Sequence, residues 1–137
     1  AVELSKRQAQ LAIASALELV GQKLIENQEA AAHAADMAME IYAMESAIVR
    51  AGKMLDAGHH WGGAARDMAE AYVNEAWPKV RTHAELLLAE VLEGKALASA
   101  LGDLQALGHR LPAAGSALRA RIADVLIDKG AFPIQAF

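Results

Sequence analysis

One stretch of the chain, residues 26–57, constrains the fold more than any other. Its apolar residues recur at alternating spacings of four and three, and they are Met37, Ile41, Met44, Ile48, Ala51 and Leu55. This spacing places them on one face of a helix and is typical of left-handed helical packing. Charged residues occupy the other face, namely Asp36, Glu40, Arg50 and Lys53. The sequence therefore predicts a long helix that must bury one face against other helices.

Four further segments have helical patterns, and they are residues 2–24, 64–93, 96–107 and 116–129. Gly58 follows the long helix at a position suited to a left-handed cap. Pro78 lies inside the third helix and predicts a kink near residues 74–78, because the apolar phase continues across it. Ser116 is the expected N-cap of the last helix, and Gly130 is expected to end it before an extended tail at 131–137.

These segments predict an all-α fold. No run alternates apolar and polar residues as a strand would. We expect residues 1–137 to form a single domain, an antiparallel up-and-down bundle with four main helices and a short connecting helix. The expected inward residues are Ile13, Leu17, Val20 and Leu24 in the first helix, Val73, Ala76, Val80, Ala84, Leu87 and Val91 in the third, and Leu118, Ile122 and Val125 in the last.

Composition excludes several kinds of site. The 137 residues include no cysteine, which excludes disulfides, thiolate metal sites, iron–sulfur clusters and cysteine nucleophiles. The net charge of −4 argues against nucleic acid as a partner. No Glu-x-x-His pair, nucleophilic serine motif or phosphate-binding glycine loop is present. We therefore expect no catalytic, cofactor-binding or metal-binding residue. With neither a spanning segment nor a signal peptide, we expect a cytoplasmic protein.

The histidines have mostly structural interpretations. His59, His60 and Trp61 could line a pocket at one end of the bundle, but we favour a turn in which Trp61 folds over the core. Glu29 and His33 have the spacing of a surface pair on a helix. His83 is expected at the boundary of the core, and His109 could cap the preceding helix. The group Met37, Met39 and Met44 is interpreted as core filling.

Two blocks of sequence resemble a known family. The first is ENQ at 26–28 followed by ADMAMEIYAM at 35–44, with Ser46 and Arg50 after it. The second is the ending IDKGAFPIQAF at 127–137. Together they resemble the extra C-terminal domain of very-long-chain-type acyl-CoA dehydrogenases, over roughly residues 24–137. Pro78 departs from the uninterrupted helix expected in that family.

The resemblance implies that this chain is a C-terminal fragment of a larger FAD-dependent enzyme. Such a parent oxidises acyl-CoA thioesters at the α,β bond in fatty acid breakdown and passes electrons to an electron-transfer flavoprotein. Its flavin site and catalytic glutamate lie in the preceding core, so Glu40 and Glu45 are not assigned that role. The domain implied here is non-catalytic, packs on the dehydrogenase core of the same polypeptide and shapes assembly of a homodimer.

The tail residues Phe132, Ile134 and Phe137 are candidate docking anchors, with folding back onto their own bundle as the alternative. Family members can be peripheral to membranes. Only Lys6, Arg7 and Lys23 are basic in the first helix, so we do not expect membrane contact through this chain.

Two other functions stay open. The chain could be a free-standing adaptor or dimerisation module, in which a charge at Ile48 or Leu87 would break the oligomer. It could also be a small-ligand or metal-binding bundle that uses the His59–Trp61 turn.

Overall fold

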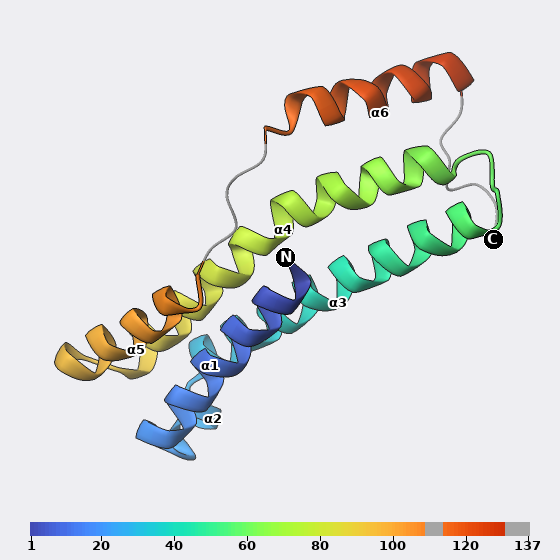
Figure 1. Ribbon diagram of the computed structural model, residues 1–137. Helices are drawn as coiled ribbons and strands as arrows, with labels where there is room; N and C mark the ends of the chain where they lie inside the picture. The colour runs from blue at the N-terminus through green and yellow to red at the C-terminus, as the bar shows by residue number, and fades with distance from the viewer. Residues whose placement is uncertain (109–113, 131–137) are drawn as a thin grey trace.

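The computed structural model describes residues 1–108 and 114–130, which form six α-helices (Figure 1). The helices are α1 (Val2–Val20), α2 (Lys23–Glu26), α3 (Gln28–Asp56), α4 (Gly62–Val91), α5 (Gly94–Ala106) and α6 (Ser116–Lys129). No strand occurs within these two ranges, which confirms the predicted all-α bundle. None of these helices is long and apolar enough to cross a bilayer.

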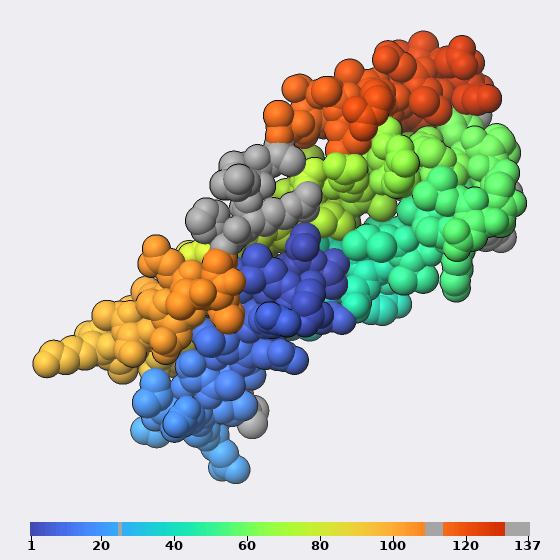
Figure 2. All heavy atoms as spheres, viewed as in Figure 1, coloured from blue at the N-terminus to red at the C-terminus, as the bar shows by residue number. Residues whose placement is uncertain are grey.

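The centre of the fold is an antiparallel hairpin of the two long helices α3 and α4. Helices α1 and α5 lie against one half of this hairpin, and α6 lies along α4 at the other half (Figures 1 and 2). Gly58 in the turn between α3 and α4 has φ +63, as predicted for a left-handed position. The two helices approach closely at this turn. Gly62 is buried there, and a Cβ at this position would lie 3.2 Å from the Leu55 Cα.

The predicted first helix is divided in two. Gly21 has φ +59 and ends α1 at Val20, and α2 is a single separate turn. Asn27 then begins α3, because its side-chain oxygen accepts a hydrogen bond from the Ala30 N–H at 3.1 Å. An asparagine cap thus explains why α3 starts at Gln28 and not at Glu26.

The ends of the later helices correct two predictions and confirm two. Ser116 is not the N-cap of α6, since helical backbone already begins at Gly115 and no side-chain cap bond forms. Helix α4 ends at Val91, before two extended residues, and Gly94 begins α5. Gly130 does end α6 in a left-handed conformation. Helix α4 continues unbroken past Pro78, as predicted, whereas the kink there stays a prediction.

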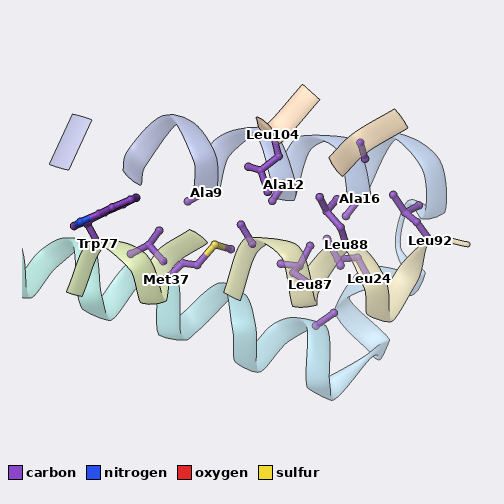
Figure 3. Close-up of a cluster of buried hydrophobic side chains, with 14 of the residues drawn as sticks. Ala9, Ala12, Ala16, Leu24, Met37, Trp77, Leu87, Leu88, Leu92 and Leu104 are labelled. Carbon is purple, nitrogen blue, oxygen red and sulfur yellow. The ribbon is translucent and has the colours of Figure 1, made fainter. Parts of the chain in front are cut away.

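The main core lies between α1, α3, α4 and α5, where Leu87, Leu88 and Met37 are fully buried. Helix α1 contributes mainly alanines to it, so its predicted inward face is correct only in part. Leu24, now in α2, is buried in this core, and Ile13 and Val20 are half-buried against it, but Leu17 is exposed. Figure 3 shows Ala9, Ala12 and Ala16 of α1 in one cluster with Trp77, Leu87 and Leu88 of α4. The small alanine side chains let the two helices approach closely, which turns Leu17 to the outside with 45% of its surface exposed.

A second, smaller core fastens α6. Met54, Trp61 and Ala64 are buried there against Val125 and Leu126 of α6. The Arg121 Nε lies 3.0 Å from the Asp67 carboxylate and links α6 to α4, and this hydrogen bond raises the pKa of the Arg121 guanidinium. The bundle therefore has two core clusters and not one core along its whole length.

The predicted inward face of α3 is correct only in part. Met37, Met44 and Ala51 are buried, but Ile48 and Leu55 are 47% and 42% exposed. Helix α1 has 19 residues against 29 in α3, and α6 packs on α4. The second half of α3 therefore has fewer helices to cover it. The predicted residues of α4 from Val73 to Leu87 are all buried, as expected.

Candidate functional site

The outward surface of α3 carries a second row of mostly apolar residues, which we call the outer stripe. It consists of Ala35, Met39, Tyr42, Ser46 and Val49, spaced alternately by four and three. All five are exposed, and Tyr42 and Met39 reach 73% and 61% of their full surface. Three large apolar or aromatic side chains on one helix face form a surface of the kind that marks an interaction site.

Two grooves flank the outer stripe and share Tyr42 and Glu45. The first lies between α1 and α3, has a volume of about 820 Å³, and is lined by residues that include Ile13, Leu17, Met37, Ile41 and Tyr42. The second, of about 660 Å³, runs along the later half of α3 to the turn, where its lining includes Val49, Arg50, Lys53 and His59. Tyr42 thus stands between two hollows that could receive side chains of a partner.

An ion pair lies in the lining of the first groove. The Lys6 ammonium of α1 donates a hydrogen bond to the Glu45 carboxylate of α3, and this bond raises the pKa of Lys6. Both charges are satisfied within the chain. A partner that covers the first groove would therefore meet a mainly apolar surface.

The predicted pocket residues at the turn lie in different surroundings. The His59 Nδ1 accepts a hydrogen bond from the Trp61 N–H at 3.1 Å, and His59 lines the second groove. The His60 ring stacks on His59 and is exposed. Trp61 is buried in the second core, which agrees with the predicted turn in which Trp61 folds over the core. Ligand binding by His59, His60 and Trp61 stays a prediction.

The other predicted anchors, Phe132, Ile134 and Phe137, lie outside the described residues, as does His109. Docking through the tail stays a prediction. Of the three methionines, Met37 and Met44 are buried as expected, whereas Met39 belongs to the outer stripe.

Polar groups also join α3 to α4 across the hairpin. The Glu40 carboxylate accepts hydrogen bonds from the Tyr72 hydroxyl at 2.8 Å and from the Lys79 ammonium at 3.1 Å. Burial raises the pKa of Glu40, but these bonds outweigh it, and the pKa lies below its ordinary value. Burial and the same contact raise the pKa of the Tyr72 hydroxyl. Glu40 therefore serves to hold the two helices together.

Glu40→Gln should lower the free energy of unfolding at neutral pH and lose this effect in acid. The folded-state pKa lies below 4.5, so the ionised carboxylate stabilises the fold above that pH. This stabilisation disappears as the pH falls through 4.5 towards the folded-state value. Urea unfolding of both proteins between about pH 6 and pH 3 should show their difference shrinking. A difference that stays constant over this range would contradict the assignment.

One side-chain cluster was not predicted from the sequence. His33 and Asp36 of α3 meet His83 of α4, and the ligand atoms of all three lie within 4.8 Å of one another. His33 thus faces α4, although its spacing from Glu29 suggested a surface pair between those two residues. The signal was present in the register of the hairpin, since His33 lies 25 residues before Gly58 and His83 lies 25 residues after it. His83 itself is half-buried, as predicted.

Comparisons with known proteins agree on a family. Residues 5–106 match the model of the acyl-CoA dehydrogenase C-terminal domain. A probable acyl-CoA dehydrogenase of Bacillus subtilis (strain 168) is 30% identical over 112 residues, which cover 81% of this chain and 19% of that protein. The crystal structure of a Bacillus anthracis acyl-CoA dehydrogenase complexed with FAD superposes with a TM-score of 0.83 at 25% identity, over 93% of this chain and 22% of that one.

The chain therefore spans about a fifth of the length of these relatives. Helix order, bundle architecture and the matched residues lead to one conclusion: the chain belongs to the acyl-CoA dehydrogenase C-terminal domain family.

Proposed function

We propose that this chain is a non-catalytic domain of an FAD-dependent acyl-CoA dehydrogenase and that it packs on the dehydrogenase core through the outer stripe of α3. The observation that carries the proposal is the exposed apolar stripe between two grooves. The relatives are about four times as long as this chain, so a large remainder of the polypeptide is the natural occupant of that surface. Burial of apolar surface would supply the free energy of docking.

The residues described here do not fit a flavin site of their own. A pyrophosphate group is commonly held by free backbone N–H groups at a glycine turn before a helix. The one adjacent glycine pair, Gly62 and Gly63, opens α4, but Gly62 packs against the Leu55 backbone. We therefore assign FAD and the dehydrogenation of acyl-CoA in fatty acid breakdown to the remainder of the parent enzyme. We further propose that the parent is a cytoplasmic homodimer that reduces an electron-transfer flavoprotein.

Two readouts test this function. The coding sequence upstream of Ala1 should continue in frame into a dehydrogenase core. The 137-residue chain, purified alone, should carry no flavin absorbance and oxidise no acyl-CoA, whereas the longer protein should do both. Stoichiometric FAD on the 137-residue chain would contradict the proposal.

Val49→Asp should separate the role of the outer stripe from ordinary folding. Val49 is 55% exposed, so the free energy of unfolding of the 137-residue chain should change by no more than about 0.5 kcal/mol. In the longer protein the aspartate would be buried without a partner, and its stability should fall by about 2 kcal/mol or more. Thermal unfolding of both proteins measures this contrast. Equal effects in the two would show that the core does not cover Val49.

The exposed stripe also suits a second candidate function, a free-standing adaptor that pairs with another copy. Ile48 is exposed beside the stripe, so Ile48→Asp can test such pairing by sedimentation. Leu87 cannot serve this purpose, because it is fully buried within the single chain and a charge there would unfold it.

A further inference from the structure

Two imidazole rings face each other between α3 and α4. The Nδ1 atoms of His33 and His83 lie 3.1 Å apart, with ring centroids separated by 5.3 Å and planes tilted by 44°. The Asp36 Oδ2 lies 3.7 Å from the His83 Nδ1. His33 and Asp36 share a helix face through their spacing of three, and the hairpin brings His83 to them. Three groups that can each donate an electron pair thus lie within 4.8 Å of one another.

Converging ring nitrogens need something between them. Each imidazole nitrogen either carries a proton or offers a lone pair, so two Nδ1 atoms in contact must share a proton or a cation. A half-buried histidine at the edge of the hairpin could turn its ring towards water, yet both rings point inward to each other. The contact is a hydrogen bond when one ring carries its proton on Nδ1, and it presents two lone pairs to an ion when both rings carry their protons on Nε2.

The distances match the coordination of zinc. Zn–N bonds of about 2.0–2.1 Å in a tetrahedral site place two nitrogen ligands about 3.3 Å apart. The observed 3.1 Å requires almost no movement of the two rings. The carboxylate at 3.7 Å reaches the same ion after a small rotation. Two histidines and one aspartate with a fourth position left for water form a familiar ligand set for Zn²⁺.

The surroundings are compatible with a cation. Asp36 contributes a negative charge, and the nearby Lys79 ammonium is already hydrogen-bonded to Glu40. The three side chains are neither fully buried nor fully exposed, so an ion could enter without unfolding the hairpin. Neither residue spacing nor composition predicted this site, because its ligands come from two helices.

We propose that His33, Asp36 and His83 bind a divalent transition-metal ion of the Zn²⁺ class and thereby cross-link α3 to α4. This inference is independent of the proposed docking function, since the outer stripe and the cluster use different residues. A bound ion would hold the open end of the hairpin together, because it bonds to both helices at once.

Titration of the untagged, metal-free chain with ZnCl₂ tests the proposal. Calorimetry at neutral pH should give one ion per chain, and the midpoint of thermal unfolding should rise with the zinc concentration. Nitrogen-15 NMR of the histidine rings should show that Zn²⁺ shifts the ring signals of His33 and His83. This spectrum uses the unmodified chain, so it does not depend on whether a variant folds.

Variants then locate the ion. His33→Ala and His83→Ala should each weaken zinc binding by about tenfold or more, and Asp36→Asn should weaken it as well. The control is the double variant His59→Ala with His60→Ala. It removes the stacked pair of imidazoles in the turn between α3 and α4 and should leave the zinc affinity unchanged. The proposal is overturned if zinc leaves both ring signals in place, or if the control variant abolishes binding while His33→Ala does not.

Discussion

Leu87→Ala should lower the free energy of unfolding by about 2–5 kcal/mol, which is a large part of the stability of a domain of this size. Leu87 lies on α4 in the middle of the main core and has no exposed surface. Its truncation removes apolar contacts and leaves a cavity that the rigid helices around it can fill only in part. Equilibrium unfolding in urea, followed by circular dichroism, measures the loss.

The neighbouring residue supplies a matched control for this change. Leu86 is 42% exposed on the same helix turn, so Leu86→Ala removes the same atoms from a position in contact with water. Its effect should be at most about 1 kcal/mol. Equal losses for the two variants would mean that α4 is rotated from the orientation described here.

Trp61→Ala should cost about 3–5 kcal/mol and should act mainly on α6. Trp61 is buried in the second core, where Val125 and Leu126 of α6 pack against it. The ion pair between Arg121 and Asp67 contributes little on its own, because water screens the exposed Arg121 guanidinium. Without the indole ring, α6 should separate from α4 while the main core persists.

Amide hydrogen exchange distinguishes this local effect from general unfolding. In Trp61→Ala, protection of the amides should be lost in α6 and retained in the half of the α3–α4 hairpin that packs against α1. His60→Ala is the control, since His60 is exposed and adjacent to Trp61. Uniform loss of protection through every helix would show that the two cores form a single cooperative unit.

The long helices could be predicted from the sequence because their signals are local. The spacing from Met37 to Leu55 requires only the period of a helix, and the burial of α4 follows from its own apolar row. Glycine positions such as Gly58 and Gly130 have positive φ for reasons that lie within a few residues.

The parts that could not be predicted depend on contacts between helices. Hydrophobicity favoured Leu17 as an inward residue, but the alanine face of α1 packs closer to α4 and excludes it. Ile48 is exposed because of which helices lie along α3, and a periodic pattern carries no such information. The meeting of His33 with His83 depends on the register of the hairpin, which becomes certain only when both helices and their turn are placed.

The accessibility of position 42 tests the central claim most directly. The chain contains no cysteine, so Tyr42→Cys introduces a unique thiol in the most exposed part of the outer stripe. Ser99→Cys on the exposed side of α5 is the control. In the 137-residue chain both thiols should react rapidly with an alkylating reagent. In the longer protein the thiol at 42 should be protected while the control still reacts, and equal reactivity of the thiol at 42 in the two proteins would contradict docking through the outer stripe.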